Sequence, residues 1–396
     1  MKATSNPTAD EFGKSENRPF QNGAEKRPKP RKSSISRRSF LGKSLAVGAG
    51  TIGAGLLSNI RTVEASGGLT PGDAALLRFA AAAEILEADF WIQYNELGGI
   101  QDDEVPGGSG NPDYTEALEV IEDEMRDYIH DNTDDEITHH TFLNAYLDSK
   151  GRAPVDLEPF RTLPGSTATG TSGILRLTNL TQLTIDTSWW TRYRSTTNPD
   201  FGAAFPNAVP SLDIGLHTAI PRNDNELGDP DNPSDHVKAI AFTAGFHFGY
   251  IEQGGTSLYA TLAQKVTSLE VLRILLSIGG SEIMHFQTWQ DKAGNATPLT
   301  DVDPINNSTV TFIDLTTGQP ETLQANLIMP EPCEFIRRGL PACSIIRPTG
   351  PGQLDATGVI NSFIADGLFR GQPPQFLHLI TSLASAADAA EREVGD

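Results

Sequence analysis

Two tetrads of the form Glu-x-x-His constrain the fold of this chain more than any other feature. One runs from Glu136 to His139, the other from Glu282 to His285, and each lies in a stretch with helical periodicity. Residues three apart lie on one face of a helix, so each tetrad presents a carboxylate and an imidazole to a single point. The tetrads therefore predict two helices whose inward faces together enclose a pair of metal ions.

A further helix is predicted over residues 71–97, where apolar residues recur at helical spacing and two glycines follow. Its inward, aromatic-rich face carries two carboxylates, Glu84 and Glu87. Carboxylates are costly to bury beside aromatic rings unless a cation neutralises them. Either glutamate therefore suits a metal ligand, and the pattern leaves the choice between them open.

The remaining ligand-bearing helix is predicted over residues 234–264, and Glu252 is the carboxylate in its interior. A turn at Thr267 separates it from the helix of the second tetrad. Glu252 lies 15 residues before Thr267, and Glu282 lies 15 residues after it. At 1.5 Å per residue, an antiparallel hairpin puts both carboxylates roughly 22 Å from the turn. The two are therefore predicted to face one another.

The segments outside these helices differ in composition. Residues 155–233 are rich in Thr, Pro, Gly and Asn and are far longer than the usual connection between helices. They predict an elaborated crossover or an inserted module. Residues 293–396 predict a C-terminal appendage that packs on the helices, with a small β-hairpin at about 309–326 and extra helices at about 358–368 and 374–393.

Residues 1–65 have the composition of an export signal. Arg37 and Arg38 form a twin-arginine pair, a weakly apolar run follows over residues 44–60, and small residues near Ala65 suit cleavage. We expect the twin-arginine translocase to export the chain and to leave it soluble in the periplasm or outside the cell. An uncleaved anchor is the alternative, because the apolar run is marginal for a membrane span.

The charge of the chain is strongly acidic. Thirty Lys and Arg stand against 51 Asp and Glu, which gives a formal net charge of −21. Residues 66–396 alone carry 18 basic and 46 acidic residues. A body of this sign repels nucleic acid and anionic lipid and attracts cations. We therefore expect metal ions, and no nucleic acid, among its partners.

The two cysteines, Cys333 and Cys343, lie outside the predicted helices of the bundle. In an oxidising compartment they could close a small loop with a disulfide, and two free thiols are the other interpretation. Neither cysteine lies near the glutamates and histidines in the sequence, so we assign them no chemistry.

The four helices resemble the ferritin-like di-metal carboxylate superfamily, in which two helices each give one Glu and two each give a Glu-x-x-His. The match covers about residues 71–150 and 235–292. With the twin-arginine signal and the segments 84–90 and 135–139, the chain is similar to exported bacterial ferritin-like proteins related to plant desiccation-related proteins.

The resemblance implies an all-α fold. Residues 66–292 would form a ferritin-like four-helix bundle with a long crossover between its second and third helices, followed by the C-terminal appendage from residue 293. Glu87 would be the ligand of the first helix, because Gln93 and Tyr94 follow it as in bacterial ferritins. Glu84 is the alternative, and the unused glutamate would orient a histidine.

The other ligands also follow from the resemblance by position. Glu136 and Glu282 would bridge two metal ions, while His139 and His285 would each bind one of them. The terminal ligand on the third helix would be Glu252.

Hard carboxylates with imidazole suit Fe or Mn, and no thiolate belongs to the set. Two such ions can bind O₂ or peroxide between them. The expected function is therefore redox chemistry of the ferroxidase or catalase type, in oxidative or desiccation stress. A non-enzymatic stress or structural protein that keeps the bundle is the alternative. The resemblance also allows a homo-oligomer.

Overall fold

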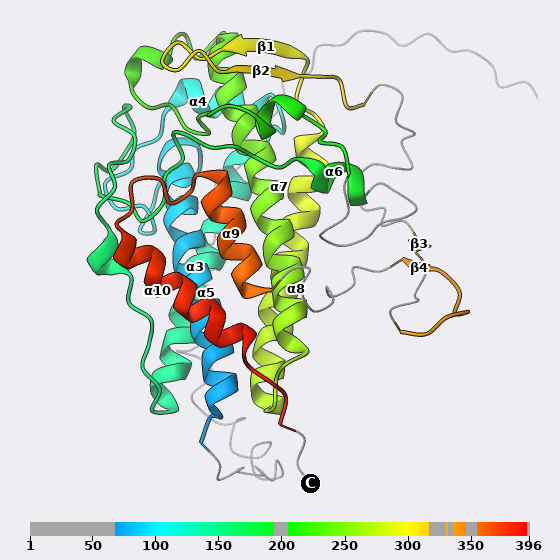
Figure 1. Cartoon of the computed structure of the whole chain (residues 1–396). Helices are drawn as coiled ribbons and strands as arrows, with labels where there is room; N and C mark the ends of the chain where they lie inside the picture. The colour runs from blue at the N-terminus through cyan, green and yellow to red at the C-terminus, as the bar shows by residue number, and fades with distance from the viewer. Residues whose placement is uncertain (1–67, 194–204, 317–329, 332–335, 345–354, 394–396) are drawn as a thin grey trace, which may run out of the picture. The chain divides into compact units, whose positions relative to one another are not determined.

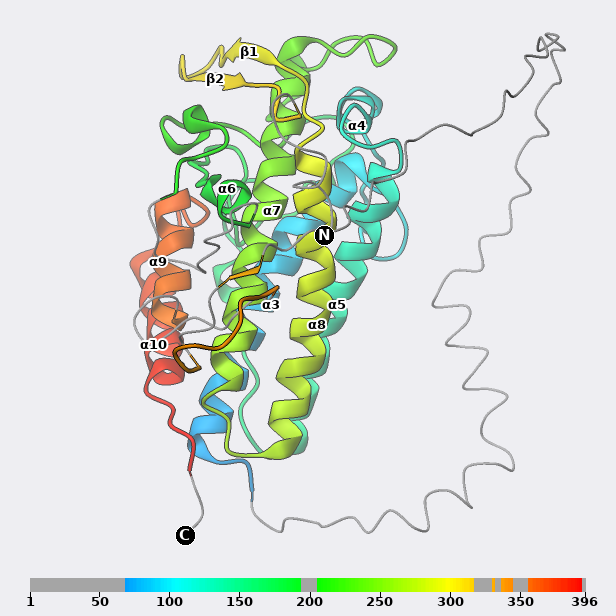
Figure 2. The ribbon, with the colours of Figure 1, turned by 90° about the vertical axis from the view of Figure 1, so that its right-hand side faces the viewer.

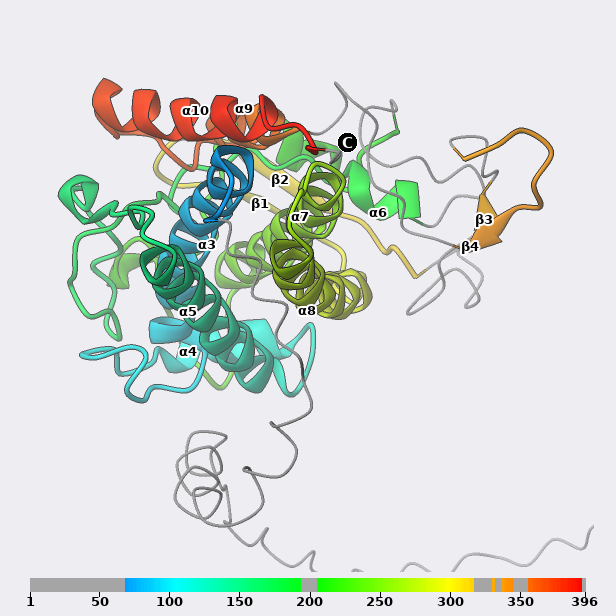
Figure 3. The ribbon, with the colours of Figure 1, turned by 90° about the horizontal axis from the view of Figure 1, so that it is seen from below.

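Four long helices form the body of the protein in the computed structural model (Figure 1). They are α3 (Pro71–Gly98), α5 (Met125–Ser149), α7 (Asp235–Ala263) and α8 (Leu269–Ala293). The structure describes residues 68–193, 205–316, 330–331, 336–344 and 355–393, within one compact unit, Ser66–Asp396. Viewed along the helices in Figure 3, α3 lies beside α5 and α7 beside α8. The predicted all-α four-helix bundle is confirmed.

Capping and turn residues set where these helices begin. The Thr70 side chain caps α3 by accepting from Asp73 N, and Ser268 caps α8 in the same way. The Asp73 carboxylate then accepts from Thr267 N and Ser268 N, both at 2.9 Å. The start of α3 is thereby tied to the turn between α7 and α8. This contact fixes the relative depth of three of the four helices.

The helical region that carries the first tetrad is broken upstream of it. A short helix α4 (Pro112–Glu119) precedes α5, and the break lies between them. Asn132 lies inside α5, where its side chain is buried and hydrogen-bonded. Its low helix propensity is therefore overridden by tertiary contacts.

The long crossover contains little regular structure in its described residues, 155–193 and 205–233. Its elements are η2 (Glu158–Phe160), α6 (Ser188–Tyr193), η3 (Pro210–Asp213) and η4 (Asp224–Glu226). The buried Asp89 carboxylate on α3 holds it in place by accepting from Leu177 N at 3.0 Å and Thr178 N at 2.8 Å. Arg161 also donates to Asp89. Buried carboxylates on the outer side of α3 thus supply partners for an irregular backbone.

The C-terminal part packs around the bundle. Strands β1 (Leu299–Val302) and β2 (Thr309–Phe312) form an antiparallel hairpin in which Leu299 faces Phe312. A small hairpin was predicted here, but at residues 309–326. In the structure β2 pairs with the chain before it, and residues 317–329 lie outside the described part. The centroids of the Phe312 and Phe242 rings lie 5.4 Å apart, and this contact packs the hairpin against α7.

Helices α9 (Ala356–Asp366) and α10 (Pro374–Asp388) lie along α7 and α3, on the side away from α5 and α8 (Figure 2). Two short strands, β3 (Pro330–Glu331) and β4 (Cys343–Ser344), pair with one another. Cys343 is exposed and free, and Cys333 lies outside the described residues.

Among the described residues, no helix combines the length and apolarity that crossing a membrane requires. The proposed signal lies in residues 1–65, outside the described part of the chain. Export through the twin-arginine route therefore stays a prediction.

His236, in the first turn of α7, ties this helix to the hairpin. Its Nδ1 lies 2.7 Å from Asp301 Oδ2 on β1, and its Nε2 lies 3.6 Å from Glu226 Oε1. Hydrogen bonds to Asp301 and then to Glu226 raise the pKa of His236 from 6.5 to about 9. The imidazolium thus binds its proton more tightly in the folded chain than in the unfolded one.

We expect His236 to make a pH-dependent contribution to stability. Because its folded pKa is raised, the contribution is complete below pH 6.5 and is lost as the pH rises through about 9. These groups are partly solvated, so its size should be about 1–2 kcal/mol. Urea unfolding of wild type and His236→Gln at pH 6 and at pH 10 measures it. An equal difference in unfolding free energy at both pH values would contradict this assignment.

Candidate metal centre

Six of the seven sequence-predicted site residues converge at mid-depth in the bundle, in two overlapping groups. The first group contains Glu84, Glu136, His139 and Glu282, and the second contains Glu136, Glu252, Glu282 and His285. Within each group, one ligand atom from every residue lies within 4.8 Å of the others. Glu136 and Glu282 belong to both groups. Each group could hold a cation, and the two groups have two carboxylates in common.

All four long helices contribute to this cluster. Glu84 comes from α3 and Glu252 from α7, while α5 and α8 each supply one Glu-x-x-His tetrad. The four glutamates are fully buried, and His139 and His285 are 9% and 7% exposed. Glu252 and Glu282 lie in the same group, as their equal distance from Thr267 indicates.

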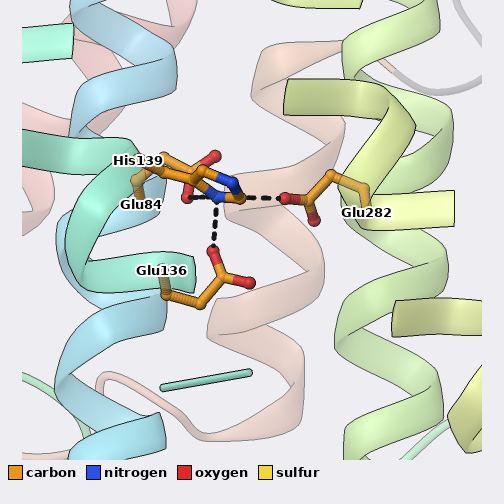
Figure 4. Close-up of side chains that lie close together, drawn as sticks. All are labelled: Glu84, Glu136, His139 and Glu282. Carbon is orange, nitrogen blue, oxygen red and sulfur yellow. Dashed lines mark hydrogen bonds and ion pairs between the residues drawn. The ribbon is translucent and has the colours of Figure 1, made fainter. Parts of the chain in front are cut away.

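The His139 ring points its Nδ1 into the first group (Figure 4). Nδ1 lies 3.1 Å from Glu84 Oε2, 3.0 Å from Glu136 Oε2 and 3.5 Å from Glu282 Oε1. On the other side of the ring, Nε2 lies 3.0 Å from Ser281 Oγ, which donates its own proton to a backbone carbonyl. Ser281 therefore accepts from Nε2–H. The neutral ring then has its lone pair on Nδ1, facing the carboxylates.

His285 has the same orientation in the second group. Its Nδ1 lies 3.0 Å from Glu136 Oε1 and 3.3 Å from Glu252 Oε2. Its Nε2 lies 3.1 Å from Asp135 Oδ2. An ionised carboxylate can only accept, so Nε2 carries the proton there as well. Both histidines thus offer Nδ1 as a ligand atom.

Further side chains hold the carboxylates in position. Trp91 Nε1 and Asn132 Nδ2 both donate to Glu252 Oε1, at 3.1 Å and 3.0 Å. Asn132 Nδ2 also lies 3.0 Å from Glu136 Oε1, and Tyr259 donates to Glu84. Sequence reasoning did not identify these roles. Asn132 lies four residues before Glu136, so its place on the same helical face was a usable signal.

The structure separates the two candidate glutamates of α3. Glu84 belongs to the first group, whereas Glu87 belongs to neither. Glu87 is still buried in the same interior, and burial followed by the charge of Glu84 raises its pKa well above the usual range. The resemblance favoured Glu87. The geometry favours Glu84, because its carboxylate reaches His139.

Hydrogen bonds within the protein do not satisfy every carboxylate oxygen of this cluster. Neither carboxylate oxygen of Glu282 accepts a hydrogen bond from any described residue, although both are buried. Buried polar atoms nearly always have a partner, so two such oxygens point to a missing one. Carboxylate oxygens and Nδ1 lone pairs that converge here form a donor set that fits hard cations.

The pKa values of the buried glutamates and histidines also indicate that the cluster lacks positive charge. Burial raises the pKa of Glu84 to about 8 and that of Glu282 well above its usual range. Burial also acts on Glu136, but hydrogen bonds from His139 and His285 outweigh it and hold its pKa well below the usual range. Although burial lowers it, the charge of Glu84 raises the pKa of His139 to about 12. Cations that bind here must therefore displace protons.

Gly255 on α7 leaves room for the carboxylate of Glu282. A Cβ atom at this position would collide with Glu282 Oε2. At the neighbouring Gly254, a Cβ would meet nothing within 4 Å. Gly255 is therefore needed for the close approach of a side chain to the backbone, and sequence reasoning did not identify it.

A separate group of potential ligands lies beyond the end of α3. Glu104 Oε2 is 3.2 Å from His130 Nδ1, and Asp102 Oδ2 is 3.8 Å from His130 Nε2. The side chains of Asp102 and His130 are 42% and 21% exposed, so solvent screens these contacts. We assign this group no metal.

Comparison with known proteins gives one family. A family model described as a ferritin-like domain matches residues 72–294, which include all four ligand-bearing helices. No curated protein matches the chain, and no solved structure does.

Proposed function

The chain belongs to the ferritin-like family, whose model spans more than half of its 396 residues, and on this premise we propose that it binds a dinuclear Fe or Mn centre that reacts with O₂ or peroxide. One observation carries the proposal. Two groups of candidate ligands share Glu136 and Glu282, and each group ends in one imidazole. Shared carboxylates are how proteins hold two cations a few ångströms apart.

Each ion would have its own terminal ligands. Glu84 and His139 would hold one, and Glu252 and His285 the other. Four carboxylates match the charge of two divalent cations, so the filled site is neutral and can stay buried. Bound Fe or Mn supplies one-electron redox steps, and the set of oxygen and imidazole ligands suits these metals.

The surrounding residues would orient and shield the ligands. Ser281 and Asp135 hold Nε2–H of the two histidines, which keeps Nδ1 available. Trp91 and Asn132 fix Glu252, and the aromatic rings around them exclude water. These contacts would hold the ligand atoms in position before a metal ion binds.

The reaction we propose is oxidation of Fe²⁺ by O₂ or peroxide, or removal of peroxide, in an exported protein under oxidative or desiccation stress. The acidic body supports it, because its field concentrates cations. A non-enzymatic stress protein that retains the bundle and its metal is the second candidate. A turnover assay separates the two.

The test begins with metal analysis of the protein purified from the exported fraction. About two Fe or Mn ions per chain are expected, as for a two-metal site. Well under one ion per chain would refute the dinuclear centre. The loaded protein is then assayed for consumption of O₂ and peroxide. Metal without turnover would favour the non-enzymatic candidate.

Gly255→Ala should weaken metal binding. The added methyl group displaces Glu282, and disturbing a ligand in this way typically costs about 10- to 100-fold in affinity. Gly254→Ala is the matched control, since it makes the same change one residue away in open space. Competition with a chelator measures both. Equal affinities for the two variants would show that Glu282 is not a ligand.

A further inference from the structure

A pocket opens on the surface of the bundle between α5 and α8, next to the candidate metal centre. Its volume is about 420 Å³, within the range of small-molecule sites. It is lined by Thr138, His139, Phe142, Arg273, Ile274, Ser277, Ile278 and Ser281. His139 therefore belongs to both sites. Its Nδ1 faces the carboxylates, and its Nε2 faces Ser281.

The charge of the lining excludes a metal ion as the occupant. None of the described residues that line the pocket is a carboxylate, although residues 66–396 carry 46 acidic side chains. Arg273 is its charged member and is positive. An entry route for cations would be expected to have acidic walls. This pocket instead suits an organic molecule that carries no positive charge.

The apolar walls suit a single aromatic ring. Phe142 is 51% exposed, so its ring is available for stacking, and Ile274 and Ile278 provide the facing apolar surface. A dry cavity of about 150 Å³ already holds benzene, so one substituted ring fits this larger pocket. The Arg273 guanidinium at the rim can lie over such a ring.

Two hydroxyl groups of the lining can accept hydrogen bonds from a ligand. Thr138 Oγ1 donates its proton to the Asp135 carbonyl at 2.8 Å, and Ser281 Oγ donates to the Ile278 carbonyl at 2.8 Å. Thr138 Oγ1 can therefore accept from a ligand, and Ser281 Oγ keeps one acceptor lone pair besides the one that accepts from His139 Nε2–H. A phenolic O–H supplies such a donor, and an ether or a quinone oxygen does not.

From these observations we propose that the pocket binds a small hydroquinone, which serves as the electron donor of the metal centre. The electron-transfer role rests on the function proposed above. A hydroquinone that becomes a quinone loses two electrons and two protons. Two trivalent ions held by the six candidate ligands would take up one electron each, with the His139 ring between the pocket and the cluster, and the protons would pass to water at the open mouth. O₂ or peroxide would be the oxidant that restores the trivalent ions.

Binding is tested first, because it does not depend on metal. Hydroquinone is titrated anaerobically into the full-length chain, both metal-free and as purified, and heat and NMR shifts are recorded. 1,4-Dimethoxybenzene has the same ring without O–H donors. We expect saturable binding of hydroquinone and at least about tenfold weaker binding of the ether, the effect of losing its hydrogen bonds.

Two tryptophan variants localise the binding. Ser277→Trp fills the pocket and should weaken hydroquinone binding at least about tenfold. Leu276→Trp is the matched control, because Leu276 is 59% exposed on the same helix and does not line the pocket. It should bind like wild type. Circular dichroism confirms that both variants fold.

Several results would overturn the proposal. These are no saturable binding to wild type, equal binding to Ser277→Trp, or equal binding of the ether. A second copy that covers this face would also prevent binding and would appear as a dimer in sedimentation.

Binding to metal-free protein, with no metal in the exported protein, would uphold the pocket and refute the metal centre. With metal present, reduction of the oxidised ions by hydroquinone should slow in Ser277→Trp and not in Leu276→Trp.

Discussion

Glu136→Ala is expected to remove both metal ions at once. Its two oxygens face opposite halves of the cluster, with Oε2 3.0 Å from His139 Nδ1 and Oε1 3.0 Å from His285 Nδ1. Without this carboxylate each cation loses one of the two ligands that they share. We expect metal content to fall from about two ions per chain to well below one. Elemental analysis of protein purified in excess metal measures this.

Two further variants control this experiment. Glu270→Ala removes an exposed carboxylate from α8 and should leave metal content unchanged. Glu84→Ala removes a ligand of the first group alone, so about one ion should remain. A Glu136→Ala protein that still holds two ions would refute the shared role of Glu136. Loss of one ion in Glu87→Ala but not in Glu84→Ala would reverse the choice between these glutamates.

Asp89→Ala is expected to cause the largest loss of stability outside the cluster. This fully buried carboxylate accepts from the backbone at Leu177 and Thr178, from the Thr178 hydroxyl and from Arg161. Its removal leaves Arg161 Nη1 and two backbone amides without their partner. Breaking a buried, hydrogen-bonded charge pair typically costs about 3–5 kcal/mol. Urea unfolding followed by circular dichroism measures the change.

Glu158→Ala is the matched control for Asp89→Ala. Glu158 binds the same Arg161, at 2.7 Å, but it is 65% exposed. An exposed ion pair contributes at most about 1 kcal/mol, so this variant should unfold almost like wild type. Similar losses in the two variants would mean that burial of Asp89 does not govern how the crossover is held on α3.

The helices and their inward faces could be predicted because their causes are local. The i, i+3 spacing puts Glu136 and His139 on one face in any straight helix, and the rise per residue sets Glu252 level with Glu282 across a tight turn. Apolar periodicity marks the length of each helix. The ferritin-like assignment followed from these features, and the family match confirms it.

Local sequence signals are insufficient where contacts distant in sequence decide the outcome. Asn132 has a low helix propensity, yet hydrogen bonds to Glu252 and from Trp289 keep it inside α5. The predicted small hairpin is confirmed, but β2 pairs with the upstream strand β1, which the local sequence did not indicate. The β propensity of the residues does not include the packing of Phe312 on α7, which depends on a contact distant in sequence.

The sequence by itself determined that four helices carry inward carboxylates and that two of them also carry an inward imidazole, because helical geometry follows from local spacing. Only the tertiary structure decided which of Glu84 and Glu87 reaches His139, since both lie on one face and the difference arises from helix rotation and depth. Side-chain contacts between helices also set which histidine nitrogen faces the carboxylates. The space at Gly255 and the pocket beside His139 depend on two helix surfaces at once. No single segment of sequence encodes such features.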